Sequence, residues 1–466
     1  MDPFEVQGTW WVPNQKRHRK ATGRVTYSPA TGTMLEAYGK RLEEESSVYV
    51  PVLHGDTEDG LMTLLGCVFE RSNRKAFSDH AAQFFSCEAV VRGGHVSRES
   101  LYQHATLQVK HLNEWARLGR MLPLGEARKY LRNAGIGVYY QEALGPKAAL
   151  ADGSIISLRA HSSHKLGSNT ASLRVEQYFH ATFSASKTLD QILDQYAAPL
   201  ANMITLLVDV PSALVSLRLT PRSRRPAMLL DPYEVGLKIQ PSIDGGHSIA
   251  YLATQIVPFD EFDFEKQLPQ WFDYSSKLGG IHGLIFGLRY SPDMSTHNRY
   301  LNAATAVEGF HRATFPSKRA KVSLKTAAAK AWLETYPEDE RNLIKARFSQ
   351  YINDPSLGDR LSELIEKAGA AFSWIVPDAG KWMTLVKNTR NNLTHQGEMS
   401  RVSVGAARML VLAESVALLA SICFLVDLGF SAGDLKIKLA RSLRIRILAQ
   451  DMQATFPALY SQTIVM

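Results

Sequence analysis

The chain has 466 residues, of which 45% are hydrophobic and 21% are charged, and its formal net charge is +8. This composition fits a folded globular protein of two or three domains and argues against disorder. Residues 291–466 hold 22 Lys and Arg against 16 Asp and Glu, a surplus of +6. Most of the basic excess therefore lies in the second half, as a phosphate-handling surface needs, although ordinary solubilising charge is the alternative.

The spacing of the cysteines and the first residues of the chain indicate the cellular compartment of the protein. Cys67, Cys87 and Cys423 are far apart along the chain and form no CxxC pair, so we expect neither a disulfide framework nor a zinc ribbon. Residues 1–5 lack the features of a signal peptide, and we predict a cytoplasmic protein. The longest apolar stretch, residues 409–426, contains Glu414, which predicts a buried helix and no membrane contact.

The first 250 residues are predicted to be mainly β-structure. Residues 22–35 form a predicted hairpin, because two strand-like runs flank a Ser-Pro-Ala-Thr-Gly turn. Further β-type runs cover residues 46–53, 61–69, 89–96, 155–158, 173–183 and 234–240. Helical patterns at residues 126–133 and 189–209 interrupt them.

From about Asn298 the apolar spacing becomes helical, and prolines separate the segments. The predicted helices are residues 297–314, 324–335, 339–352, 359–374, 379–387 and 402–429, with an earlier one at 264–274. Short connections favour an antiparallel bundle. Residues 436–446 alternate charged and apolar side chains, which fits an RNA-facing amphipathic element, an edge strand or a helix. The fold class is therefore α+β, a β-rich N-terminal domain followed by an all-α bundle.

The segment Arg390-Asn391-Asn392-Leu393-Thr394-His395 follows the helix predicted over residues 379–387. Cleaving RNA without a metal ion drives the 2′-OH onto the adjacent phosphorus, which requires proton transfer and stabilisation of a phosphorane. A histidine with a near-neutral pKa can move the proton, and a forked, permanently charged guanidinium can stabilise the phosphorane. Arg390 and His395 therefore form a candidate ribonuclease motif, R-x4-H.

A second pair, Arg159 and His164, has the same spacing but lies in a β-like region rich in Ser and Gly. Such a short pattern also arises by chance, so its structural context decides between the two copies. On an ideal helix, Arg390 and His395 are about 140° apart. They converge only if the helix ends there, or if a second copy of the chain faces the first.

The order Arg-Asn-x-x-x-His resembles the motif of HEPN ribonucleases, and the C-terminal half resembles the ApeA-like HEPN domain. The first half resembles the ApeA N-terminal domain in segments that contain Gly and Trp, namely residues 8–13, 23–27, 35–39, 111–115 and 270–272. This resemblance implies a bacterial anti-phage effector of abortive infection. It also implies a metal-independent endoribonuclease activity, with tRNA as a candidate target.

The resemblance implies catalytic roles for Arg390, Asn391 and His395. Arg390 stabilises the scissile phosphate, His395 acts as general base or acid, and Asn391 orients the histidine or the phosphate. The alternatives are an arginine paired with a surface carboxylate, a histidine packed at a helix end and an asparagine cap. Glu308 is expected to pair with Arg390 or tune His395, or to lie on a solvated helix face.

Lys387, Arg401 and Arg408 flank the motif and are predicted to bind RNA phosphates. Ordinary solubility is the alternative for Lys387, and a buried ion pair with Glu414 is the alternative for Arg408. Glu308 and His311 have the spacing of a metal pair, but one pair is not a site. We predict no metal and no other cofactor.

We expect residues 1–270 to form a sensing domain and residues 271–466 to form a HEPN ribonuclease domain. The expected partners are RNA, a second copy of the chain in a homodimer or larger even assembly, and a phage protein as trigger. One rival interpretation is a non-catalytic HEPN module that only binds RNA or dimerises. A HEPN domain serving nucleotide transfer is another, and it normally implies a nucleotidyltransferase partner.

Overall fold

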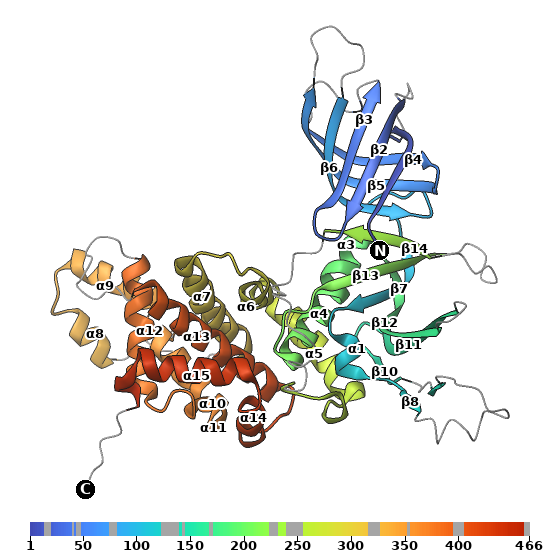
Figure 1. Ribbon diagram of the computed structural model, residues 1–466. Coiled ribbons are helices and arrows are strands. Elements are labelled where there is room, and N and C mark those ends of the chain that lie inside the picture. Colours follow the sequence, from blue (N-terminus) through green and yellow to red (C-terminus); the bar gives the residue numbers. More distant parts are fainter. Residues whose placement is uncertain are drawn as a thin grey trace. The chain divides into compact units, whose positions relative to one another are not determined.

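The computed structural model describes residues 1–13, 20–39, 42, 48–73, 82–122, 139–141, 145–166, 171–222, 232–238, 255–315, 327–351, 355–394 and 405–460. These residues fall into two compact units, Met1–Asp273 and Tyr274–Met466. The first unit is mainly β-structure and the second is helical (Figure 1). The predicted order, a β-rich region followed by an all-helical region, is confirmed.

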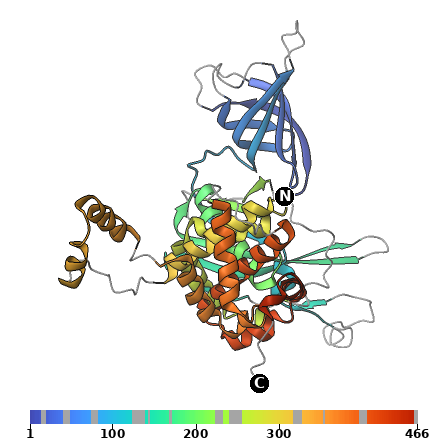
Figure 2. The ribbon, with the colours of Figure 1, turned by 90° about the vertical axis from the view of Figure 1, so that its left-hand side faces the viewer.

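The first six strands form a barrel, drawn in blue in Figures 1 and 2. They are β1 (Phe4–Trp11), β2 (Lys20–Ser28), β3 (Gly32–Gly39), β4 (Tyr49–Thr57), β5 (Gly60–Asn73) and β6 (Ala82–Arg92). Neighbours follow the order β6-β3-β2-β1-β4-β5, and β5 also pairs with β6, which closes the ring. Alternate side chains point inward, so Trp10, Leu35, Leu53 and Phe85 are fully buried. The predicted hairpin is β2 and β3.

Close packing inside the barrel brings together residues that are distant in sequence. A Cβ on Gly55 of β4 would lie 2.3 Å from the indole of Trp10, so this strand requires glycine there. Cys67 on β5 and Cys87 on β6 are directly opposite, with their sulfur atoms 3.2 Å apart and both thiols free. Burial raises the pKa of the Cys67 thiol well above its usual range. Their separation along the chain therefore does not keep them apart in the fold.

An open sheet continues from β6, whose second half pairs with β14. The order runs on through β14 (Tyr233–Leu237), β13 (Leu214–Pro221), β7 (Tyr102–Val109), β12 (Ala171–Lys187), β11 (Ile155–Leu166) and β10 (Lys147–Ala149). A separate pair joins β8 (Arg120–Leu122) and β9 (Tyr139–Gln141). Strands β1, β7 and β13 were not predicted from the sequence, and neither were the three-residue strands β8, β9 and β10.

Helices of the first unit pack on this open sheet. They are α1 (Leu112–Ala116), α3 (Leu189–Ile192), a π-helical turn η1 (Leu193–Ala197), α4 (Ala198–Val208), the short η3 (Phe259–Glu261) and α5 (Phe264–Leu278). The α3–α4 stretch matches the helix predicted over residues 189–209, whereas the one predicted at 126–133 lies outside the described residues. Trp271 on α5 donates its indole N–H to the Pro199 carbonyl, 2.8 Å away. The two units divide within α5.

The second unit is a bundle of helices (Figures 1 and 2). Its elements are α6 (Gly280–Tyr290), α7 (Thr296–Thr314), α8 (Ala327–Leu333), α9 (Glu338–Tyr351), α10 (Leu357–Ala368), α11 (Ala370–Ser373), α12 (Ala379–Thr394), α13 (Ala406–Asp427), α14 (Ala432–Leu439), α15 (Leu443–Thr455) and the turn η4 (Pro457–Leu459). Helix α7 packs against α13, α6, α10 and α12. Because α7 touches so many neighbours, its residues connect most of the bundle.

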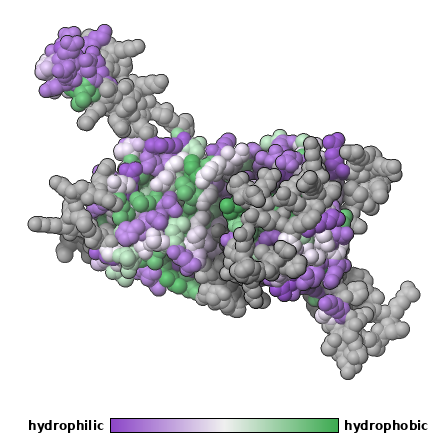
Figure 3. All heavy atoms as spheres, turned by 90° about the horizontal axis from the view of Figure 1, so that it is seen from above, coloured by the Kyte–Doolittle hydropathy of each residue, from purple (hydrophilic) through white to green (hydrophobic). Residues whose placement is uncertain are grey.

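Helix α13 is the apolar centre of the bundle. By length and composition alone it is able to cross a membrane, but 67% of its most apolar window is buried inside the protein. Apart from its last residue, Asp427, the helix has one acidic side chain, that of Glu414. Glu414 pairs with Arg299 of α7 at 3.1 Å and with Arg444 of α15 at 3.4 Å. The prediction of a buried helix is therefore confirmed. On the face drawn in Figure 3, hydrophobic residues lie in small groups among hydrophilic ones.

Several helix boundaries differ from the predicted ones. The single helix predicted over residues 359–374 is wrong, because Gly369 has a φ of +50° and separates α10 from α11. Helix α6 was not predicted, because Gly280, Gly283 and Gly287 weaken its helical pattern. Residues 436–439 end α14, residues 440–442 form a turn and residues 443–446 begin α15, so the edge-strand alternative is wrong.

Candidate functional site

Helix α12 carries the first part of the R-x4-H motif. It extends through Thr394, well beyond the predicted end at residue 387, so Arg390 and Asn391 lie in its last turn. Arg390 is therefore helical and is followed by four further helical residues, up to Thr394. His395 and Arg401 lie outside the described residues.

A buried face fixes α12 in the bundle. Trp382 is fully buried and donates its indole N–H to Ser415 of α13 at 3.0 Å, and Val386 and Thr389 are buried on the same side. Tyr300 of α7 donates its hydroxyl to the Val386 carbonyl at 2.5 Å. Burial raises the pKa of Tyr300 above its usual range, so this hydroxyl stays protonated and remains a donor. These contacts position the last turn of α12 beside α7.

Arg390 meets Glu308 across the α7–α12 contact. Its guanidinium nitrogen lies 3.7 Å from one carboxylate oxygen of Glu308, and Arg312 binds the other oxygen at 3.0 Å. The Arg390 side chain is 38% exposed, whereas that of Glu308 is 23% exposed. One carboxylate shared by two guanidiniums leaves net positive charge at this point. Arg390 is therefore oriented from one side while its other N–H groups remain accessible to an anion.

Glu308 and His311 do not act together, although they have the spacing of a metal pair. Glu308 engages Arg312 and Arg390, whereas His311 is buried and its two ring nitrogens meet side chains of α10. Its Nε2 lies 2.9 Å from Glu363, and its Nδ1 accepts from Arg360 at 3.0 Å. Among the described residues there is no group of three or more His, Cys, Asp or Glu side chains placed to hold a metal.

The exposed side of α12 is basic. Lys387 and Asn391 are exposed, and residues 379–394 include Lys381, Lys387 and Arg390 but no Asp or Glu. Arg408, in the first turn of α13, is also exposed, and its guanidinium lies 5.1 Å from the centre of the Phe456 ring. The alternative in which Arg408 forms a buried ion pair with Glu414 is wrong, because Glu414 pairs with other arginines.

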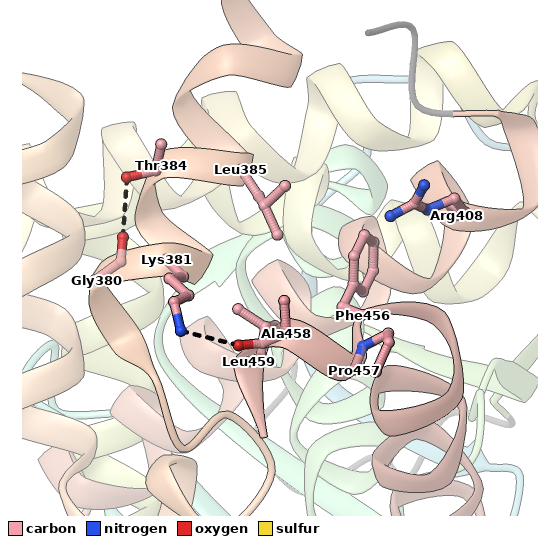
Figure 4. Close-up of a pocket in the computed structure, with 9 residues that line it drawn as sticks. All are labelled: Gly380, Lys381, Thr384, Leu385, Arg408, Phe456, Pro457, Ala458 and Leu459. Carbon is pink, nitrogen blue, oxygen red and sulfur yellow. Dashed lines mark hydrogen bonds between the residues drawn. The ribbon is translucent and has the colours of Figure 1, made fainter. Parts of the chain in front are cut away.

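A cleft that was not predicted adjoins this surface (Figure 4). It has a volume of about 550 Å³ and lies between the first half of α12, the start of α13 and the turn η4. Its walls include Leu385, Arg408 and Phe456, which are far apart in sequence. No local pattern connects these positions, so only the folded bundle reveals the cleft.

The second R-x4-H copy has a different setting. Arg159 lies on strand β11, is exposed, and donates from Nε to the Ser157 hydroxyl at 3.1 Å. Its backbone pairs with Tyr178, and that of His164 pairs with Leu173. Five residues along a strand span about 17 Å, against about 7.5 Å along a helix. Arg159 and His164 are therefore poorly placed to share one phosphate.

Two family comparisons cover most of the chain. Residues 5–235 match the ApeA N-terminal domain 1 family, and residues 301–434 match the Apea-like HEPN family. The second match includes Glu308, α12 and Arg408. No curated protein and no solved structure gives a match.

The chain is thus a HEPN protein in which a β-rich domain precedes the HEPN helices. It carries both an ApeA N-terminal domain and an ApeA-like HEPN domain. The resemblance inferred from the motifs is confirmed. A HEPN domain of this kind implies a ribonuclease of a defence system.

Proposed function

We propose that the protein is a metal-independent endoribonuclease of bacterial anti-phage defence, active in the cytoplasm on RNA, with tRNA as the substrate class. The observation that carries the proposal is Arg390, which stands accessible at the end of α12, oriented by Glu308, within the HEPN match. A permanently charged guanidinium in this position suits a phosphate that gains negative charge during reaction.

The reaction uses His395 to take the proton of a ribose 2′-OH, whose oxygen then attacks the adjacent phosphorus. The bond from phosphorus to the 5′-oxygen breaks, and that oxygen receives a proton. Arg390 stabilises the phosphorane between these steps, and Asn391 orients the phosphate or the imidazole. The products are a 2′,3′-cyclic phosphate and a 5′-hydroxyl. Lys387, Arg401 and Arg408 bind neighbouring phosphates.

The test is RNA cleavage by the purified protein, with total RNA as substrate and mapping of the cut ends. Intact protein should give 2′,3′-cyclic or 3′-phosphate ends with EDTA present, and His395→Ala should reduce cleavage about 100- to 1,000-fold. EDTA inhibition that Mg²⁺ reverses contradicts the mechanism. RNA binding without any cleavage supports instead the rival class, a non-catalytic HEPN module.

We further propose that two chains build the site together, as a homodimer or larger even assembly, because each chain supplies one motif arginine and one motif histidine. Mixing Arg390→Ala protein with His395→Ala protein tests this composition. If one site draws its residues from both chains, the mixture should regain part of the activity that each variant lacks. A monomeric active enzyme in sedimentation contradicts the proposal.

The ApeA N-terminal domain is proposed to sense a phage protein and release the activity of the HEPN domain. A shift of about 1 Å in a catalytic group changes rates by roughly 100-fold, so modest realignment is sufficient. A cut after residue 270 divides helix α5, so the intact chain is the better probe. Lysate from phage-infected cells should activate cleavage and lysate from uninfected cells should not. Equal activity with both lysates contradicts a trigger.

A further inference from the structure

Apart from Arg408, the residues that line the cleft beside α12 have no role in the function proposed above. Figure 4 shows Leu385 of α12 and Phe456 at the end of α15 facing the same space, with the guanidinium of Arg408 over the Phe456 ring. Phe456 is 3% exposed and Leu459 is 2% exposed, so the floor of the cleft is apolar. A volume of about 550 Å³ suits a small, flat organic group.

The polar groups at the rim differ in what they already bind. Lys381 donates to the Ala458 carbonyl at 3.0 Å and pairs with Asp378 at 3.0 Å, and the Thr384 hydroxyl donates to the Gly380 carbonyl at 3.0 Å. Within the described part of the chain, the Arg408 guanidinium lies over the Phe456 ring and has no carboxylate partner. An exposed guanidinium on an aromatic face therefore marks the opening. This arrangement can receive a planar group by stacking and an adjacent anion by charge.

The cleft and Arg390 flank the same exposed ridge of α12. Leu385 and Arg390 are separated by about 7.5 Å along the helix axis and, around the exposed side of the helix, by about 220°, because the shorter arc of about 140° holds the buried Val386 and Thr389. The ridge between them carries Lys387 and Asn391, both exposed, and no carboxylate occurs anywhere in residues 379–394. A polyanion that crosses this ridge therefore reaches both the apolar cleft and Arg390 without meeting an acidic side chain of α12.

We propose that this cleft receives one unpaired nucleobase of the RNA substrate, a few nucleotides from the phosphate that Arg390 contacts. This inference rests on the proposed ribonuclease function and adds how its substrate is positioned. The base enters against Leu385 and Phe456, and Arg408 stacks on it or binds its phosphate. A base held in the cleft determines which phosphate of the RNA backbone lies over the ridge of α12. The enzyme then prefers sites where a nucleotide is already unpaired, such as loops.

The test measures binding of a short, fluorescently labelled single-stranded oligoribonucleotide to His395→Ala protein, which should not cut it. A matched series replaces one nucleotide at a time by an abasic ribose. One position in the series should bind about 10- to 100-fold more weakly than intact RNA, because a stacked base is lost. Thr384→Trp, added to His395→Ala, fills the cleft from its rim. It should weaken binding of intact RNA by a similar factor and abolish the difference between intact and abasic RNA.

Thr335→Trp is the matched control, because Thr335 is also exposed, its hydroxyl also donates to a backbone carbonyl, and it does not line the cleft. It should bind RNA normally. Ala458→Trp fills the cleft from the opposite wall and repeats the test if Thr384→Trp fails to fold. If RNA is cleaved by the intact protein but neither cleft variant changes binding or the abasic profile, the nucleobase site is wrong and the ribonuclease function stands. If the intact protein neither binds nor cleaves RNA, both proposals fail.

Discussion

Arg159 and Arg390 each precede a histidine by five residues, but they belong to different kinds of structure. Arg159 lies within strand β11, where its Nε is used by Ser157 of the same strand. Arg390 lies near the end of α12, where Glu308 of another helix orients it and the last described residue of the helix follows four positions later. A strand keeps two residues of this spacing about 17 Å apart, whereas a helix end lets the chain turn back. The element that carries a short motif therefore decides what its residues can do together.

The barrel and α12 also differ in how their basic side chains are paired with carboxylates. In the barrel, Arg24 pairs with Glu5 and Glu36 at 3.1 Å, and Arg92 pairs with Asp59 at 3.0 Å. On α12, Lys381 pairs with Asp378 and Arg390 shares Glu308 with Arg312, whereas Lys387 has no carboxylate partner among the described residues. Positive charge on the barrel surface is largely balanced by its neighbours, while α12 keeps a surplus that is available to a phosphate.

The largest expected effect separates the two arginines. Arg390→Ala should reduce RNA cleavage about 100- to 1,000-fold, because it removes a charge that stabilises the transition state. Arg159→Ala should leave the rate within about twofold, because surface changes away from special features have small effects. Rates are measured on one RNA under single-turnover conditions, with circular dichroism to check the fold. Equal losses in both variants contradict the assignment of the site to α12.

Acid should destabilise the helical region through His282. Burial lowers the pKa of His282 to about 4, so the folded protein holds it neutral while the unfolded chain binds a proton below its ordinary pKa of 6.5. Stability is therefore full above pH 6.5 and falls as the pH drops from 6.5 towards 4, by on the order of 2 kcal/mol at pH 5. Urea unfolding at pH 7 and pH 5 measures this loss, and His282→Gln should reduce it.

The sheet region offers the comparison for this effect. Burial also lowers the pKa of His180 on β12 to about 4, with Arg159 adding to the shift. The sign is the same, so His180→Gln should likewise flatten the loss of stability between pH 6.5 and 4. If neither variant changes the pH dependence, other groups control acid unfolding.

Tyr300→Phe should have a smaller effect, on stability more than on chemistry. The change removes the hydroxyl that donates to the Val386 carbonyl and keeps the buried ring. One such hydrogen bond contributes about 1 kcal/mol to the free energy of unfolding. Urea unfolding should show this loss while RNA cleavage changes only slightly. A collapse of activity with unchanged stability would place Tyr300 in the chemistry.

Glu308→Gln should have the smallest effect. The pair with Arg390 is 3.7 Å long and partly exposed, and such pairs contribute about 0.2–1 kcal/mol. Losing it should slow cleavage about two- to fivefold, because Arg390 is less well oriented while its charge remains. Glu334→Gln, at an exposed position after α8, is the control and should not change the rate. A loss as large as that of Arg390→Ala would make Glu308 a direct participant.

The sequence predicts this architecture better than its details. Alternating and helical spacings of apolar residues distinguish the β-rich half from the helical bundle. The residues around Arg390 likewise indicate a site at α12. Both can be predicted because each pattern lies within one short segment of the sequence. The break at Gly369 depends on one backbone angle, and the missed strands β1, β7 and β13 are stabilised by their neighbours more than by their own patterns. The Cys67–Cys87 contact and the cleft at Phe456 combine distant segments, so they follow only from tertiary packing.

The closure of the barrel by β5 and β6 also bears on self-association. An unpaired sheet edge is a template on which a second chain can add a strand, which is how many β-proteins begin to aggregate. Because β5 pairs with β6, the long sheet of the described residues has one free end, at β10. That strand has three residues, Lys147–Ala149, and begins with an exposed lysine. A short, charged edge is a poor template, so β10 gives a second chain little opportunity to extend this sheet.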